Sequence, residues 1–150
     1  MAGDGGRGRL LVAAQFALLA VWLVAGPHVS AHVIGIFLQL GGLAVAAWAF
    51  VVMTAAQRRL FRIAPDPTGH ATLVTWGPYR WIRHPMYSAT LLVVGPAWIA
   101  VPPDWRGIGF AALAAVLVTK LRYEERLLAG HFDGYAGYCR TSSRLVPGVY

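Results

Sequence analysis

The stretch VIGIFLQLGGLAVAAWAFVVMTAA, residues 33–56, contains no charged side chain and decides the fold. About 20 helical residues are needed to cross the hydrocarbon core of a bilayer, so this stretch is long enough to span one. A second apolar stretch, residues 10–25, precedes it, and Gln15 is its sole polar residue. Two such stretches in succession predict a pair of transmembrane helices.

The composition of the whole chain agrees with this prediction. Of the 150 residues, 57% are hydrophobic and 13% are charged, whereas soluble domains usually carry about 25% charged residues. A chain this apolar has too little polar surface to cover itself in water, and its length suggests one compact domain. We therefore expect a single membrane domain over residues 1–150, with generic membrane helices in residues 1–56.

The second half of the chain begins with a polar segment and then returns to apolar runs. Residues 57–84 are polar, rich in turn formers and aromatic, as is typical of a membrane interface. Two further apolar runs, residues 85–101 with Pro96 inside and residues 107–119, suggest an antiparallel hairpin, and residues 121–129 have helical character. The expected fold is an all-α integral membrane bundle with about four transmembrane helices and a cytoplasmic C-terminal helix.

The positions of the basic residues predict the orientation. With four spans, all thirteen Lys and Arg residues except Arg106 lie in the N-terminal segment, the central loop or the C-terminal segment. Positive residues are retained in the cytoplasm, so we expect a multi-pass protein of the cell inner membrane with both termini cytoplasmic. The net charge of +7 is spread between apolar runs, and this distribution does not predict binding to nucleic acid.

The first apolar run also resembles a signal peptide. Arg7 and Arg9 precede it, and Val29-Ser30-Ala31 is typical of a cleavage site. A retained helix is favoured because the chain continues directly into a second span. Cys139 is the single cysteine and cannot form an internal disulfide, and the histidines lack metal-ligand spacing, so no metal site is predicted.

Two segments are richer in functional side chains than membrane anchoring requires. One is GPYRWIRHPMY, residues 77–87, and the other begins at Glu124-Glu125 and continues to Tyr138. The predicted hairpin places them face to face at the membrane surface. An aromatic belt with lipid-binding arginines would explain the first segment, and helix salt bridges worth ~0.2–0.5 kcal/mol each would explain the second. However, acids adjoining a span are expensive and are therefore functional candidates.

The two segments resemble the isoprenylcysteine carboxyl methyltransferase family, which is related to the phospholipid N-methyltransferases. The resemblance covers residues 73–147. It rests on Leu73-Val74-Thr75-x-Gly77-Pro78-Tyr79-x-x-x-Arg83-His84-Pro85-x-Tyr87, followed in the family's order by Glu124-Glu125, Leu128, Phe132, Tyr135, Tyr138, Arg144 and Pro147. Two departures leave the shape of the pocket open: Ala89 replaces a frequent glycine, and the spacing from Phe132 to Tyr135 is one residue shorter than usual.

The resemblance implies a compact, bacterial-type membrane methyltransferase that uses S-adenosylmethionine at the cytoplasmic face. Residues 73–147 would form its cofactor-binding region, the acceptor would be a lipid-like or prenylated small substrate, and membrane lipids would be partners; the oligomeric state stays open. Catalytic roles would belong to Arg83 and Glu125. The residues implied in cofactor binding are His84, Tyr87, Glu124, Tyr79, Tyr135 and Tyr138.

Two alternatives remain. A membrane NADPH-dependent reductase of the sterol reductase type has a similarly built C-terminal region, but its pattern places Asn-Tyr after the proline and an acid soon afterwards. Here Pro85 is followed by Met86-Tyr87-Ser88-Ala89, which disfavours that class. A non-catalytic lipid-binding membrane subunit is the second alternative, and it leaves the two spaced motifs unexplained.

Overall fold

The computed structural model describes residues 4–26, 28–57, 73–99 and 105–150. This part of the chain is helical, with no β-strand, and confirms the predicted all-α fold. In chain order its elements are α1 (Asp4–Ala25), α2 (Val33–Gln57), the 3₁₀ helix η1 (Gly77–Arg80), α3 (Pro85–Ile99), α4 (Trp105–His131) and α5 (Tyr135–Thr141).

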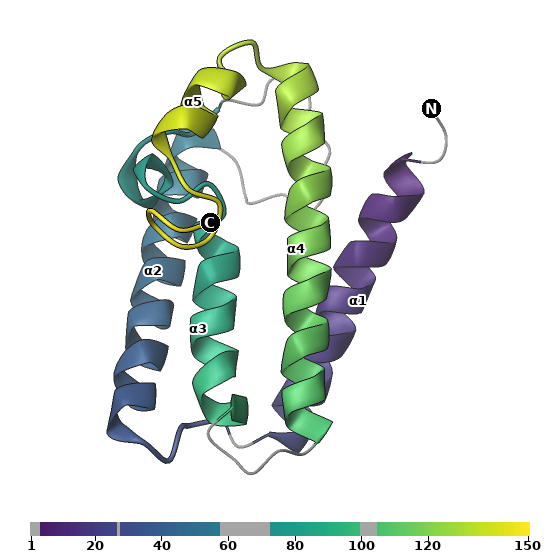
Figure 1. Cartoon of the computed structure of the whole chain (residues 1–150), viewed down its shortest axis with the longest axis vertical. Helices are drawn as coiled ribbons and strands as arrows, with labels where there is room; N and C mark the ends of the chain where they lie inside the picture. Colours follow the sequence, from purple (N-terminus) through teal and green to yellow (C-terminus); the bar gives the residue numbers. More distant parts are fainter. Residues whose placement is uncertain (1–3, 27, 58–72, 100–104) are drawn as a thin grey trace.

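The four long helices run up and down along one axis, and α5 lies at the end of the bundle where α4 finishes (Figure 1). Helix α2 packs along α3, α1 packs along α4, and the contact between α3 and α4 joins the two pairs. Helix α1 begins, α3 begins and α4 ends at the same end of the bundle (Figure 1). That end therefore collects segments that are far apart in the sequence.

Helices α1 and α2 are long and apolar enough to cross a membrane, over Gly6–Ala25 and Val33–Ala56. Most of their side chains are left uncovered by the rest of the molecule; Val24, for example, is 87% exposed and Phe37 is 69% exposed. A soluble protein rarely leaves an apolar surface of this extent in contact with water. Lipid is the solvent that suits these two helices.

The main core lies between α3 and α4. Leu113, Leu117 and Leu121 are fully buried, and their spacing of four residues places them in one stripe along α4. This stripe packs with Val94 and Trp98 of α3 in one hydrophobic cluster. The α3–α4 hairpin therefore holds the main core of the described residues, and the polar end is built on it.

A second, smaller core lies between α2 and η1 and comprises Ala49, Val52, Val74 and Tyr79. Gly77 makes this contact possible. Its φ of +62° favours glycine, and a Cβ there would stand 2.8 Å from a methyl group of Val52. The start of η1 thus lies directly against α2, and Tyr79 is buried in this contact.

The structure differs from expectation in the C-terminal half. Residues 121–129, for which helical character is predicted, are helical but belong to the last turns of α4, because strong helix formers continue without interruption after residue 119. The C-terminal helix is instead α5, a seven-residue helix. Residues 58–72, which make up much of the predicted polar loop, and residues 100–104 lie outside the described residues.

Candidate functional site

Arg83, His84 and Tyr87 meet Glu124 and Glu125 at the end of the bundle where α4 finishes. The first three residues lie just before and within the first turn of α3, and the two glutamates lie on the last part of α4. Because α3 and α4 are antiparallel, residues 42 positions apart come within hydrogen-bond distance. The predicted meeting of the two segments is confirmed in the structure.

Glu125 is held by two arginines. Arg83 donates from Nε to Oε1 at 2.8 Å, and Arg144 donates from Nε to Oε2 at 2.8 Å. Burial raises the pKa of the Glu125 carboxyl, but His84, Arg83 and Arg144 together outweigh burial and bring that pKa to about 2. Glu125 is therefore ionised at neutral pH, with both of its oxygens occupied.

Arg83 also binds the chain that follows α5. Its Nη1 donates to the carbonyl of Cys139 and to the hydroxyl of Ser142, each at 3.3 Å, and to the Ser142 carbonyl. A cation placed on the free carbonyls at the end of a helix is favourable. Arg83 thus links Glu125 of α4 to the end of α5.

The backbone reinforces this link. The amide of Arg83 donates to the carbonyl of Ser143 at 2.8 Å, and the amide of Ser143 donates to the carbonyl of Trp81 at 2.9 Å. The amide of His84 donates to the carbonyl of Arg144 at 3.1 Å. The segments before α3 and after α5 therefore run side by side, which carries Arg144 to Glu125.

Glu124 binds the other side of the cluster. The Tyr87 hydroxyl contacts both of its oxygens, at 2.7 and 2.8 Å. The His84 ring stacks on the Tyr87 ring with 5.3 Å between centroids and an interplanar angle of 6°. The two ring nitrogens of His84 lie 3.6 Å from Glu124 and 3.7 Å from Glu125, so this imidazole stands between two carboxylates.

Sequence reasoning did not include Lys120 in the site. Its side chain is buried, with Nζ 3.9 Å from Glu124 Oε1 and 5.1 Å from the centroid of the Tyr87 ring. The i,i+4 spacing of Lys120 and Glu124 is also that of an ordinary helix salt bridge, which is the alternative explanation of this segment. The available signal was spacing, because Lys120 lies three residues after Leu117 and seven after Leu113, on the buried stripe of α4.

The three remaining predicted residues are tyrosines; two of them join elements of the fold, and the third has a hydroxyl without a partner among the described residues. Tyr138 donates to the carbonyl of Tyr79 at 2.6 Å, and the Tyr79 hydroxyl lies 3.5 Å from the carbonyl of Ala49, so these two tie α5, η1 and α2 together. Tyr135 is buried, and its hydroxyl has no hydrogen-bond partner among the described residues. Burial, with a smaller contribution from Glu125, raises the pKa of Tyr135, so this hydroxyl stays protonated at neutral pH.

A cleft of about 690 Å³ lies beside the cluster, between the end of α4, the turn that follows and α5. Glu125 and Tyr135 line it, together with residues that sequence reasoning did not place in the site: Arg122, Arg126, Ala129, Phe132, Asp133, Ala136, Cys139 and Arg144. Guanidinium groups, carboxylates and aromatic rings suit a polar ligand that carries charges of both signs and a flat ring. Of these additions, Phe132 and Arg144 are already part of the quoted motif, which gives neither of them a role.

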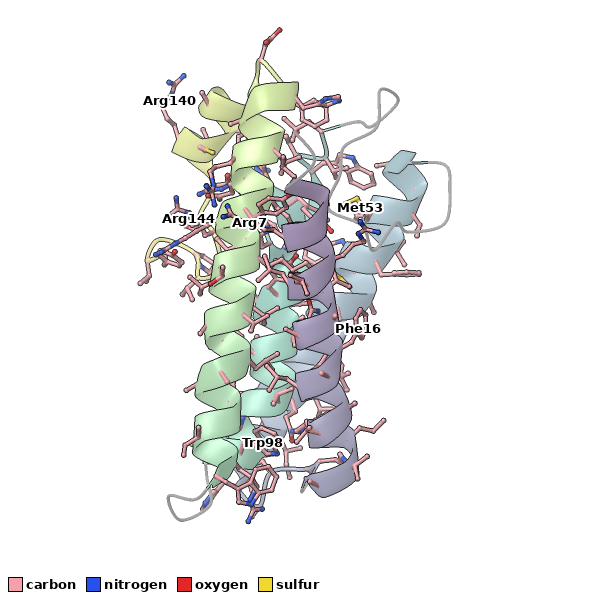
Figure 2. The ribbon with its side chains drawn as sticks, turned by 90° about the vertical axis from the view of Figure 1, so that its right-hand side faces the viewer. Arg7, Phe16, Met53, Trp98, Arg140 and Arg144 are labelled. Carbon is pink, nitrogen blue, oxygen red and sulfur yellow. The ribbon has the colours of Figure 1, made fainter. Side chains whose placement is uncertain are left out.

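The cleft lies at the basic end of the molecule. Arg140 and Arg144 lie toward this end, Arg7 of α1 lies on the same side, and Trp98 lies at the opposite end (Figure 2). Within the described ranges, no group of three or more His, Cys, Asp or Glu side chains is placed to hold a metal ion. The chemistry available here is that of paired charges, one imidazole and tyrosine hydroxyls.

Comparison with known proteins gives two matches. A family model described as phospholipid methyltransferase matches residues 30–134, more than half of the chain. The cobalt-zinc-cadmium resistance protein CzcN of Cupriavidus metallidurans is 34% identical over 77 residues, which cover 51% of this chain and 36% of that relative. The aligned part thus spans about a third of the relative's length, and no solved structure matches.

Proposed function

The chain belongs to the phospholipid methyltransferase family and is a membrane protein, and from this premise we propose that it transfers a methyl group from S-adenosylmethionine to a lipid-like or prenylated acceptor at the cytoplasmic membrane face. The observation that carries the proposal is the ion-paired cluster of Arg83, His84, Glu124 and Glu125 beside a cleft. Two motifs that are distant in sequence build this cluster.

The residues of the cleft fit the proposed cofactor. S-adenosylmethionine supplies a reactive methyl group on a cationic sulfur, and it also carries an ammonium, a carboxylate and an adenosine. Arg122 and Arg126 line the cleft and suit the carboxylate, while Asp133 suits the ammonium. The rings of Phe132 and Tyr135 suit the sulfonium, an attraction of roughly 0.5–2 kcal/mol.

The roles of Arg83 and Glu125 follow from their contacts. Glu125 lines the cleft and is the acid that would contact the cofactor. Arg83 keeps Glu125 ionised and fixes its orientation through the bond at 2.8 Å. Methyl transfer is an in-line displacement, so the main task of the protein is to hold both reactants in line.

His84 determines which acceptors are possible. A carboxylate acceptor needs no base, whereas an amine must lose a proton before or during transfer. His84 Nε2 is buried and has no hydrogen-bond partner within the described part of the chain. We assign His84 as the proton acceptor for an amine substrate, with Glu124 and Glu125 stabilising the imidazolium that forms.

The acceptor would reach the cluster from the bilayer. Tyr87 belongs both to the charged cluster and to the apolar core between α3 and α4. A lipid chain in the membrane and a cofactor in the cytosol would thus meet near Tyr87. The distribution of basic residues supports a multi-pass topology in the inner membrane with both termini cytoplasmic.

Calorimetric titration of the detergent-purified protein with S-adenosylmethionine tests this proposal, with NADPH titrated in parallel. We expect micromolar binding of S-adenosylmethionine by the wild type and its loss in Glu125→Gln and Arg83→Gln, provided that both variants keep their helical circular dichroism. Arg140→Gln is the matched control, because Arg140 is exposed and lies outside the cleft. Binding of NADPH alone would point to a reductase, and no binding to folded protein would leave a non-catalytic subunit.

The class of acceptor needs a second measurement. Membranes are incubated with the protein and S-adenosylmethionine labelled in its methyl group, and the lipid extract is then treated with mild alkali. Label released as methanol identifies a methyl ester and hence a carboxylate acceptor, whereas alkali-stable label excludes an ester and leaves an amine or a thiol. With an amine acceptor, His84→Gln should lower activity by more than it lowers the binding of S-adenosylmethionine, whereas with a carboxylate acceptor the two losses should be equal.

A further inference from the structure

Lys120 is a buried cation whose neighbours come from three elements. It is 4% exposed. Its Nζ donates to Gln15 Oε1 of α1 at 2.9 Å, lies 3.9 Å from Glu124 Oε1 on α4, and stands over the Tyr87 ring of α3 at 5.1 Å. Because a buried ammonium is costly unless it is paired and hydrogen-bonded, these contacts must work together.

Gln15 is equally unusual on its own helix. It is the sole polar residue of the apolar run from residue 10 to residue 25, and an amide in an apolar surrounding needs a hydrogen-bond partner. The bond to Lys120 supplies that partner. Helix α1 packs mainly on α4, so this bond joins α1 to the charged cluster.

Helix α1 also lies outside the part of the chain that the family model matches, which begins at residue 30. The family match therefore assigns α1 no part in the site. Gln15 contacts Lys120, and Lys120 in turn lies beside Glu124, so a single side chain connects α1 to the charged cluster.

We propose that Gln15 and Lys120 are positioning residues of the site, through which α1 holds Glu124 and the Tyr87 ring in place; this inference rests on the proposed function. Gln15 keeps the ammonium 3.9 Å from Glu124 Oε1, which is beyond hydrogen-bond distance. Both glutamate oxygens then remain available to the Tyr87 hydroxyl, at 2.7 and 2.8 Å.

The expected effect of losing Gln15 follows from this geometry. Without that acceptor, the ammonium moves toward Glu124 and forms a direct charge-assisted bond, which is stronger than the bond from a neutral hydroxyl. The lysine then competes with Tyr87 for the carboxylate. Glu124 and the Tyr87 ring leave the arrangement that the ligand requires.

The test measures the affinity for S-adenosylmethionine by calorimetry, together with thermal unfolding in detergent. Gln15→Leu and Lys120→Met should each weaken binding about 10-fold, the size typical of residues that orient a ligating group. Gln15→Glu and Lys120→Arg keep an acceptor and a cation in place and should remain within about 3-fold of the wild type.

Two neighbouring substitutions serve as controls. Phe16 follows Gln15 but is 48% exposed, and the Thr119 hydroxyl bonds only within its own helix, to the carbonyl of Ala115 at 2.8 Å. Phe16→Leu and Thr119→Val should therefore bind S-adenosylmethionine as the wild type does. If Gln15→Leu does not fold, Gln15→Asn replaces it, because the shorter amide stays polar but no longer reaches Lys120.

Unchanged affinity in both Gln15→Leu and Lys120→Met overturns the inference. It is also overturned if Gln15→Glu binds as weakly as Gln15→Leu, since the acceptor atom would then have no role. If the wild type binds no S-adenosylmethionine, the proposed function fails. The coupling between Gln15 and Tyr87 can still be tested by the loss of unfolding free energy that Tyr87→Phe causes. That loss should be smaller in a Gln15→Leu background, and equal losses in the two backgrounds would refute the coupling.

Discussion

Glu125 is the residue on which the electrostatics of the site depend. Arg83 reaches it from the segment before α3, and Arg144 reaches it from the segment after α5, each at 2.8 Å. Without this carboxylate, two guanidinium groups would face each other at close range. Glu125 therefore stabilises the polar end of the fold as well as lining the cleft.

Acid should destabilise the protein through Glu125. Its pKa in the folded protein is about 2, below the ordinary 4.5 that applies to the unfolded chain. The ionised carboxylate thus contributes stability that is complete above about pH 4.5 and is lost as the pH falls toward about 2. Thermal unfolding in detergent from about pH 6 to about pH 2.5 should show a steeper loss for the wild type than for Glu125→Gln; parallel curves would contradict this.

Tyr135 should respond differently in stability and in binding. Its hydroxyl is buried without a partner among the described residues, and such a group costs about 1–3 kcal/mol. Tyr135→Phe should therefore leave the free energy of unfolding unchanged or raise it, while it weakens binding of S-adenosylmethionine. Chemical unfolding and calorimetry measure the two quantities.

Tyr138→Phe is the control for that experiment. Its hydroxyl donates to the carbonyl of Tyr79 at 2.6 Å, so its loss should lower the free energy of unfolding by about 1 kcal/mol. If Tyr135→Phe destabilises the protein as much as Tyr138→Phe does, the Tyr135 hydroxyl is already satisfied in the folded state. It would then not be available to a ligand.

Among the elements, α2 and α3 approach each other closely at Gly42. A Cβ at Gly42 would stand 2.9 Å from Leu92 Cβ and 3.1 Å from the carbonyl of Ala89. Ala89 is itself the position where the resembled family often has glycine. Gly42 of α2 thus lies against Ala89 of α3, where the family often has the smaller glycine.

Gly41 and Gly42 provide a matched pair of substitutions. Gly42→Ala should destabilise by about 1–3 kcal/mol, because the new methyl group overpacks the contact. At Gly41 no heavy atom lies within 4 Å of an added Cβ, so Gly41→Ala should be neutral or stabilise by about 0.5–1 kcal/mol through helix propensity. Unfolding by detergent titration measures the free energy of unfolding of both variants. Equal effects would show that α2 and α3 do not pack closely at Gly42.

The four long helices were largely predictable, since each contains a largely apolar run. The boundary that failed, the end of α4, shows why. An apolar run ends near residue 119, but the helix continues to His131 because the charged residues that follow are good helix formers. The end of an apolar run shows where the apolar surface of a helix ends, whereas helix propensity determines where the helix itself ends.

The pairing of Arg83 and His84 with Glu124 and Glu125 was also predictable, because the hairpin requires it. The contact between Gln15 and Lys120 was not predictable. The two residues are 105 positions apart in the sequence, and no local pattern fixes the relative rotation of their helices. The cleft was not predictable either, because its arginines look like ordinary solvated residues until α5 is placed opposite α4.

At the scale of the whole molecule, the basic residues gather at the end that carries the cleft. Arg7, Arg140 and Arg144 lie toward that end, and Trp98 lies at the other (Figure 2). In a membrane this asymmetry should fix the orientation, with the cleft facing the cytoplasm.

Cysteine labelling tests the orientation. In a Cys139→Ser background, Arg140→Cys should react with a membrane-impermeant maleimide only after cells are opened. Arg106→Cys, at the opposite end, should react in intact cells. The reverse pattern would place the cleft outside the cytoplasm and away from the supply of S-adenosylmethionine.

The side-by-side pairing of the segments before α3 and after α5 also sets the order of events during synthesis. Membrane helices emerge from the ribosome one after another, and earlier parts of a chain fold first. Arg83, however, has no partner at Ser142 until 59 further residues have been made. The helices can therefore take their places in the bilayer while Arg83 and Glu125 still lack Ser142 and Arg144, and the site closes only after those residues have been made.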